Sequence, residues 1–161
     1  PISLLDSENS ADELAGRFCY YDGYEKWSAD FVKDRSSNFS DLIEANPDGI
    51  NIIDYLEVQD NFWLVGRYIR EVRDALKGGI AIVVLQKGER SKLPVGKEFS
   101  RHLARCVVTI DKGVLTIIKA KDKAQKNINP VNMRWSFTVD DTGTKFLFVK
   151  PLRPSLDFDE M

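Results

Sequence analysis

Two stretches of the chain are apolar along almost their whole length, as strands buried on both faces of a sheet require. They are residues 50–53, Ile-Asn-Ile-Ile, and residues 80–85, Ile-Ala-Ile-Val-Val-Leu. Between them, apolar residues recur at spacings of three and four, which is typical of a helix that packs one face against a core. These residues are Phe62, Val65, Ile69, Val72 and Leu76. The order strand, helix, strand predicts a βαβ unit with parallel strands.

Local signals predict further elements before and around this unit. Leu4 and Leu5 indicate a strand at the start of the chain, and Ser10 with Glu13 forms a capping box ahead of a helix. Asp60 is placed to cap the central helix, and Gly78-Gly79 is placed to end it.

Residues 19–49 are polar with interspersed aromatic side chains, which we interpret as packing residues rather than a base-stacking platform. Trp27 and Phe31 lie four residues apart, which suits a helix. Residues 38–46 predict another short helix, which is followed by a turn at residues 46–49, Asn-Pro-Asp-Gly.

The pattern changes after residue 105, where short strands are separated by turn signals. We expect strands at residues 106–110, 114–118, 133–139 and 145–149. Asp111-Lys112-Gly113 predicts a hairpin turn between the first two, and residues 140–144 predict a turn between the last two. We expect antiparallel strands appended to the parallel sheet. Residues 151–161 are acidic and contain proline, which predicts a loose tail.

Composition narrows the class of protein. The 161 residues are 43% apolar and 30% charged, which suits one domain of ordinary size in a soluble protein. The longest apolar runs are far shorter than the ~20 residues that span a bilayer, so we expect no membrane partner. Two cysteines and one histidine provide neither a disulfide framework nor a zinc cluster, and we expect reduced thiols in a cytoplasmic protein.

Charge is divided unevenly along the chain. Residues 1–60 hold 14 acidic and 4 basic side chains, whereas residues 61–150 hold 8 acidic and 18 basic ones. Such asymmetry indicates a polyanion-binding face or self-association, unless folding interleaves the charges. Residues 87–105 form a polar stretch with six basic side chains, which either contact phosphates or are simply solvated. They are Lys87, Arg90, Lys92, Lys97, Arg101 and Arg105.

Polar side chains follow three of the predicted parallel strands, namely Glu8, Asp54 and Gln86. The carboxyl ends of parallel strands line the edge where α/β sheets bind ligands. At such an edge Asp54 can hold Mg²⁺ against a nucleotide phosphate, and Glu8 can orient or deprotonate a nucleophilic water. Taken alone, Asp54 is equally consistent with a residue that caps the next turn. The repetition over three strands indicates a site.

The order of elements and these strand ends resemble the RecA-like ATPase core over residues 2–149, especially that of DnaB-type replicative helicases and of phage or plasmid replication ATPases. Leu5-Asp6-Ser7-Glu8-Asn9 is similar to the segment with that family's catalytic glutamate, and Ile52-Ile53-Asp54-Tyr55-Leu56-Glu57 looks like its Walker B strand. The resemblance implies that Glu8 activates water and that Asp54 lies on the magnesium side of the nucleotide.

Two further segments resemble motifs of this family. Leu85-Gln86-Lys87 is similar to the motif whose glutamine senses the γ-phosphate and relays that state to DNA-binding loops. The resemblance therefore places DNA contacts on the basic residues that follow: Lys87, Arg90, Lys92, Lys97 and Arg101. Ile118-Lys119-Ala120-Lys121-Asp122 resembles the segment that reaches the ATP of a neighbouring subunit, which implies a catalytic role for Lys119 and Lys121. Many helicases have an arginine finger where this chain has Lys121.

The family's phosphate-binding P-loop, G-x-x-x-x-G-K-[ST], is absent from these 161 residues. We therefore expect residues 1–150 to form a partial RecA-like P-loop NTPase domain, the C-terminal part of a larger ATPase. Its parallel sheet would be flanked by helices and would lack the first strand, which in the family lies between the strand ending at Gln86 and the one from Cys106. Exposed strand edges at that gap predict an oligomer or an altered strand order.

The resemblance implies an ATP- and Mg²⁺-dependent enzyme of DNA replication or recombination, helicase-like or recombinase-like, that binds single-stranded DNA as a homo-oligomeric ring or filament. Without the P-loop, we expect this chain alone to hydrolyse little ATP. One alternative is a non-catalytic RecA-like module that binds DNA or a protein partner without nucleotide. Another is an unrelated α/β enzyme that holds a metal through Glu8 and Asp54.

Overall fold

The structure is a computed structural model that describes residues 2–26, 29–33, 38–56, 61–88, 91, 94, 96–122 and 126–152, with only the backbone described at 29–33 and 97. The chain forms two compact units, Pro1–Leu103 and Ala104–Met161. The sequence indicated one domain over residues 1–150, so the division after Leu103 is a finding of the structure. Among the described residues, no helix is long and apolar enough to cross a membrane.

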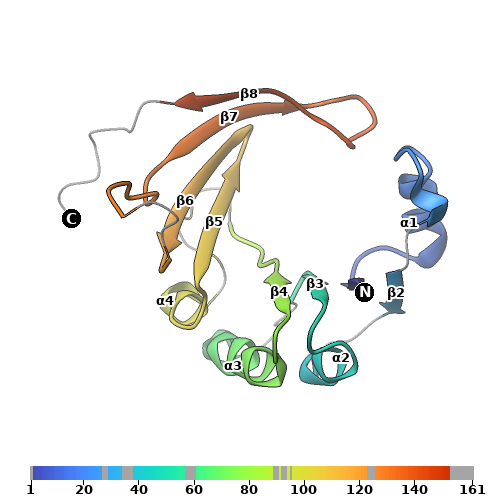
Figure 1. The fold of residues 1–161 in the computed structure, drawn as a ribbon, viewed down its shortest axis with the longest axis horizontal. Coiled ribbons are helices and arrows are strands. Elements are labelled where there is room, and N and C mark those ends of the chain that lie inside the picture. Colours follow the sequence, from blue (N-terminus) through green and yellow to red (C-terminus); the bar gives the residue numbers. More distant parts are fainter. Residues whose placement is uncertain are drawn as a thin grey trace. The chain divides into compact units, whose positions relative to one another are not determined.

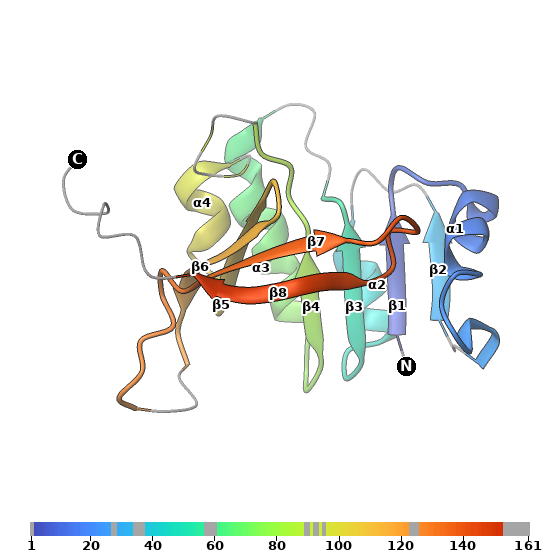
Figure 2. The ribbon, with the colours of Figure 1, turned by 90° about the horizontal axis from the view of Figure 1, so that it is seen from above.

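The first unit contains a four-stranded parallel sheet in the order β2-β1-β3-β4, whose strands lie side by side in Figure 2. They are β1 (Ile2–Asp6), β2 (Ala29–Lys33), β3 (Ile50–Asp54) and β4 (Ile80–Val83). The predicted α/β class with a parallel sheet and a βαβ unit is confirmed. In the described sheet β4 pairs only with β3, and the strand that begins at Cys106 lies in the other sheet.

Strand β2 corrects the prediction of a helix around Phe31. Residues 29–33 pair in parallel with β1, from Ile2 opposite Ala29 to Asp6 opposite Lys33. The i,i+4 spacing of two aromatic residues is weak evidence for a helix, whereas phenylalanine and valine favour strands when a neighbouring strand is present. Trp27, the other residue of that prediction, lies outside the described residues.

Four α-helices and two short 3₁₀ helices are described. The α-helices are α1 (Ala11–Phe18), α2 (Ser40–Ala45), α3 (Val65–Ala75) and α4 (Lys97–Arg101), and the 3₁₀ helices are η1 (Tyr24–Lys26) and η2 (Phe62–Leu64). The predicted helices over α1 and α2 are confirmed, as is the Ser10–Glu13 capping box.

The central helix α3 differs from the prediction at both ends. It begins after η2, and its N-cap residue, Leu64, makes no side-chain cap. The predicted cap Asp60 lies outside the described residues. At the other end the helix stops at Ala75, because Leu76 already has an extended backbone. The Gly78-Gly79 pair therefore lies in the following loop rather than at the helix end.

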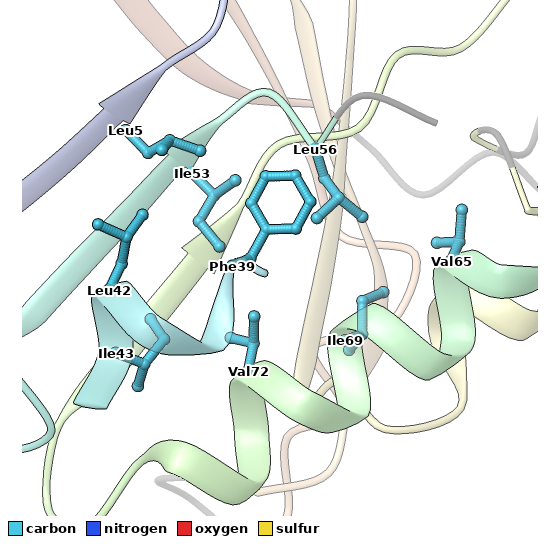
Figure 3. Close-up of a cluster of buried hydrophobic side chains, with 9 residues drawn as sticks. All are labelled: Leu5, Phe39, Leu42, Ile43, Ile53, Leu56, Val65, Ile69 and Val72. Carbon is cyan, nitrogen blue, oxygen red and sulfur yellow. The ribbon is translucent and has the colours of Figure 1, made fainter. Parts of the chain in front are cut away.

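One face of the parallel sheet is covered by α2 and α3, and the core lies between them (Figure 3). Leu5, Ile53 and Leu56 pack there against three residues of or beside α2 and three residues of α3. These six are Phe39, Leu42, Ile43, Val65, Ile69 and Val72. All nine are at least 91% buried, which is the burial that the apolar pattern of β3 and α3 predicts.

The second unit is an antiparallel sheet in the order β5-β6-β7-β8. Its strands are β5 (Cys106–Asp111), β6 (Val114–Ala120), β7 (Arg134–Val139) and β8 (Phe146–Leu152), and all are visible in Figure 1. The four predicted strands are confirmed, but they form a sheet of their own rather than an extension of the parallel sheet.

The β5–β6 turn and strand β8 can be compared with the predictions for residues 111–113 and 151–161. The β5–β6 turn has positive φ at Lys112 (30°) and Gly113 (78°), as a two-residue hairpin turn requires. Strand β8 continues to Leu152, with Pro151 opposite Trp135. The first two residues of the predicted loose tail thus belong to a strand, and residues 153–161 lie outside the described part of the chain.

Candidate functional site at the carboxyl edge of the parallel sheet

Backbone hydrogen bonds connect the exits of β1, β3 and β4. The Ser7 amide donates to the Asp54 carbonyl over 2.9 Å. The Val84 amide donates to the Ile53 carbonyl over 2.9 Å, and the Leu56 amide donates to the Val84 carbonyl over 3.0 Å. The three segments that follow these strands therefore keep a fixed relation to one another beyond the last strand residues.

Asp6 shapes the segment that carries Glu8. This carboxylate is 5% exposed, and its Oδ1 accepts from the amides of Glu8 (2.9 Å) and Asn9 (2.7 Å). The Asn9 side-chain amide donates to both carboxylate oxygens, at 3.1 and 2.9 Å. Backbone amides bound to one carboxylate hold the turn in a single conformation. Sequence reasoning missed Asp6, although an aspartate that ends a strand is a turn signal, because its side chain can accept from the amide two residues on.

Ser7 connects the β1 exit to the β3 exit. Its Oγ donates to the Tyr55 carbonyl and accepts from the Tyr55 amide, each over 3.2 Å. The hydroxyl thus satisfies both polar groups of the residue that follows Asp54, and the peptide bond between Asp54 and Tyr55 is cis. Ser7 was not singled out by the sequence, because nothing local shows that its partner lies 48 residues away.

The two outer side chains of the predicted site are in contact. The Gln86 Nε2 donates to Glu8 Oε1 over 3.4 Å, and both side chains are exposed. Their strands, β1 and β4, flank β3, which ends at Asp54. The structure therefore brings the strand-end residues Glu8, Asp54 and Gln86 to the same edge of the sheet, as the sequence predicted.

Asp54 lies among other acids. Its pKa is raised above the usual range, first by partial burial and then by the negative charges of Asp6 and Glu8, while Arg17 of α1 acts in the opposite direction. Asp6 and Asp54 are register partners on neighbouring strands. An electropositive ligand at this position would relieve the repulsion between these carboxylates.

The described residues contain no group of three or more His, Cys, Asp or Glu side chains arranged to hold a metal ion. Mg²⁺ that arrives with a nucleotide needs only one or two protein carboxylates, because phosphates and water supply its other ligands. The exposed Asp54, with Glu8 nearby and a raised pKa, has the donor chemistry for that arrangement.

The structure describes only some of the basic residues predicted to bind DNA. Lys87 follows Gln86 directly and is partly buried, and Lys97 begins α4. Arg101 also lies on α4, where its Nη1 is 3.1 Å from Glu98 Oε1. Arg90 and Lys92 lie outside the described residues.

Lys119 and Lys121 belong to the second unit. Lys119 lies on β6, and Lys121 follows that strand with its amide 2.8 Å from the Arg105 carbonyl. The Lys121 side chain is exposed. Arg105 and Asp122 form an ion pair next to it. The predicted role of these lysines at the ATP of a neighbouring subunit stays a prediction.

Neither the protein-family models nor the curated protein sequences yield a match to this chain.

Proposed function

We propose that the unit Pro1–Leu103 carries the catalytic edge of a RecA-like ATPase of DNA replication or recombination, helicase-like or recombinase-like. The observation that carries the proposal is the meeting of Glu8 and Gln86 beside Asp54 at the carboxyl ends of adjacent parallel strands. Open α/β sheets bind their ligands at this edge. An aspartate on the side of Mg²⁺ and a carboxylate or glutamine that orients the attacking water are recurring parts of sites that hydrolyse nucleotides.

Each residue has a role in this proposal. Glu8 is exposed and held by the Asp6 turn, so its carboxylate can orient and deprotonate a water. Asp54 would hold Mg²⁺, which when bound supplies charge neutralisation for the phosphates. Gln86 donates to Glu8 here, and its amide can donate to a γ-phosphate oxygen instead. Exchange between these two acceptors would couple the nucleotide state to the basic segment that begins at Lys87.

The remaining parts of the proposal concern partners. Single-stranded DNA would contact the basic residues Lys87, Arg90, Lys92, Lys97 and Arg101, and Lys119 and Lys121 would serve the ATP site of a neighbouring copy in a ring or filament. The P-loop is not among these 161 residues, so the proposed activity requires one from sequence outside them. Both cysteines, Cys19 and Cys106, are free thiols, which supports a reducing, cytoplasmic location.

The test is ATP turnover by the full-length protein with Mg²⁺ and single-stranded DNA. Glu8→Gln should keep ATP binding and lower kcat about 10²- to 10⁴-fold, the usual contribution of a general base. Asp54→Ala should weaken the Mg²⁺ dependence of binding as well as turnover. Glu44→Gln removes an exposed carboxylate on α2 and serves as the matched control, with unchanged kcat expected. Normal turnover by Glu8→Gln would remove Glu8 as the base.

A second candidate function is a non-catalytic RecA-like module that binds DNA or a protein partner. The absence of a P-loop from these residues favours it, because backbone amides and a lysine of that loop hold the triphosphate. In that case the affinity for single-stranded DNA would be the same with and without ATP and Mg²⁺. A nucleotide-dependent change in affinity would exclude the second candidate.

A further inference from the structure

One face of the parallel sheet is apolar and exposed. Strand residues alternate between two faces, and the face with Leu5 and Ile53 packs on α2 and α3. The opposite face carries Ile50 beside Ile80 and Ile52 beside Ile82 in register. Four of its apolar side chains on β3, β4 and the residue after β4 are exposed. They are Ile50 (39% exposed), Ile80 (58%), Ile82 (49%) and Val84 (40%), and we call them the isoleucine face.

The antiparallel sheet also has an exposed apolar face. Ile110, Leu115 and Trp135 are neighbours in register, and Val139 is opposite Phe146. The exposed apolar side chains on this side are Val108 (43%), Ile110 (58%), Val139 (47%) and Phe146 (65%), which we call the valine-phenylalanine face. The other side of the same sheet carries the register neighbours Thr109, Thr116 and Arg134, with Leu147 opposite Thr138, so it mixes polar and apolar residues.

Apolar sheet faces that are exposed over several neighbouring strands indicate surfaces that a partner covers. Parallel sheets are covered on both faces in stable proteins, and antiparallel sheets are solvated on the polar face only. Contiguous apolar patches beyond a few hundred Å² are rare on monomers and mark interaction sites. Each of the two faces spreads over neighbouring strands rather than consisting of scattered single residues.

Charge indicates which faces pair. The unit Pro1–Leu103 has 18 acidic and 13 basic side chains, and the unit Ala104–Met161 has 7 acidic and 10 basic ones. Contact between identical faces of two copies would bring units of the same net charge together. Contact between the isoleucine face of one copy and the valine-phenylalanine face of another brings units of opposite net charge together, which favours association.

We propose that the valine-phenylalanine face of one copy of this chain packs on the isoleucine face of a second copy. Such an interface joins two different surfaces and leaves one of each unpaired, so repetition produces a ring or a filament. The proposal names the contact behind the self-association suggested above. Asp54 lies on the same side of β3 as Ile50 and Ile52, but the interface is tested without nucleotide, so its test does not depend on ATP chemistry.

Sedimentation velocity of the 161-residue chain over a concentration series tests the interface. The unaltered chain should form species larger than dimers as concentration rises. Ile82→Asp and Phe146→Asp should each raise the apparent dissociation constant about 30-fold or more, as loss of a central interface residue does. Ile80→Asp repeats the first test at a neighbouring position. A chain that stays monomeric at every concentration overturns the proposal.

Mixing the two variants distinguishes this interface from a symmetric one. Ile82→Asp retains an intact valine-phenylalanine face and Phe146→Asp retains an intact isoleucine face, so the mixture should form a dimer that grows no further. If Ile82→Asp alone still forms dimers as tight as those of the unaltered chain, the contact joins identical faces and the proposal is wrong.

Matched controls remove an exposed apolar side chain away from either face. Tyr20→Asp in the first unit and Ile128→Asp in the second replace side chains that are 58% and 43% exposed, and both should associate as the unaltered chain does. Far-UV circular dichroism of each variant checks that it is folded. The association measurement and the ATP turnover measurement are separate, so failure of one proposal leaves the other standing.

Discussion

Gln86 donates a hydrogen bond to Glu8 over 3.4 Å although the two residues are 78 positions apart in the chain. The contact exists because β1, β3 and β4 are adjacent and parallel, so that their carboxyl ends share one edge. Asp54 ends the middle strand of the three. Three polar residues with no local relationship thus become neighbours through sheet order alone.

The pKa of Asp54 should respond in opposite directions to two nearby substitutions. Partial burial, Asp6 and Glu8 raise this pKa, and Arg17 lowers it. Glu8→Gln removes a negative charge and should lower the pKa of Asp54, whereas Arg17→Met removes a positive charge and should raise it further. The measurement is the ¹³C chemical shift of the Asp54 carboxyl group as a function of pH. An unchanged pKa in both variants would contradict the placement of these groups.

The same pKa shift predicts how Asp54 affects stability. A raised pKa means that the folded state binds this proton more tightly than the unfolded state, so the ionised carboxylate opposes folding at neutral pH. Asp54→Asn should therefore raise the free energy of unfolding at pH 7. The gain should shrink as pH falls through the pKa of Asp54, where the native side chain also becomes neutral. Urea unfolding at neutral and acid pH, with Glu44→Gln as control, measures the difference.

The sequence predicted the strand-end residues because their signal is local. Runs of isoleucine and valine identify β3 and β4. The polar residue that follows each run can then be read directly from the sequence. The helix α3 was predicted for the same reason, since its apolar spacing is regular. The C-terminal end of α3 was not predicted. There the backbone of Leu76 is extended, and the amides of Lys77 and Gly79 donate to the Pro47 carbonyl, which is distant in the sequence.

Other features depend on contacts between distant residues. Residues 29–33 form a strand because β1 lies beside them, and their own pattern is too short to indicate this. Whether the hairpins of β5–β8 join the parallel sheet is decided by strand pairing, which turn signals do not specify. Asp6 is one of 25 acidic residues in the sequence, and only its burial and hydrogen bonds distinguish it.

Asp6 is expected to be the acid whose loss most disturbs the site. In Asp6→Ala the amides of Glu8 and Asn9 lose a buried charged acceptor, which costs about 1.5–3 kcal/mol in free energy of unfolding. The turn should also loosen, so that the Gln86–Glu8 hydrogen bond weakens. Urea unfolding measures the first effect, and amide chemical shifts of residues 7–9 measure the second. Glu44→Ala should change stability by no more than about 0.5 kcal/mol.

The N-terminus of α1 gives a prediction with a built-in control. Ser10 Oγ accepts from the Glu13 amide over 3.3 Å, and the Ser10 amide donates to Glu13 Oε2 over 2.7 Å. Ser10→Ala removes the first bond and should cost about 1 kcal/mol, while Ser10→Gly should cost only a few tenths, since glycine is a tolerated N-cap. Thermal unfolding distinguishes them. An unchanged melting temperature in Ser10→Ala would show that the hydroxyl contributes nothing to this helix.

Glu13 should make the stability of α1 depend on pH. Its pKa is lowered by hydrogen bonds from the Ser10 backbone and then the Ser10 side chain. A lowered pKa stabilises the fold above the ordinary pKa of glutamate, and the contribution is lost as pH falls through the lowered value. Glu13→Gln should therefore lower the melting temperature at pH 7, and the difference from the unaltered chain should fade in acid.

Alanine in place of Gly79 and alanine in place of Gly16 should change the free energy of unfolding in opposite directions. A Cβ on Gly79 would lie 2.4 Å from the Gly49 carbonyl oxygen and 2.7 Å from that of Pro47, so the turn before β3 and the loop before β4 would have to separate. Gly79→Ala should cost at least about 1–3 kcal/mol, as overpacking does.

Gly16 is the matched position, because it lies within α1 and a Cβ there would meet nothing within 4 Å. Gly16→Ala should stabilise the chain by up to about 1 kcal/mol through helix propensity. Urea unfolding of the two variants measures both changes. A stable Gly79→Ala would mean that the loops before β3 and β4 do not approach each other closely. That result would also weaken the placement of β4 beside β3, on which the meeting of Gln86 with Glu8 depends.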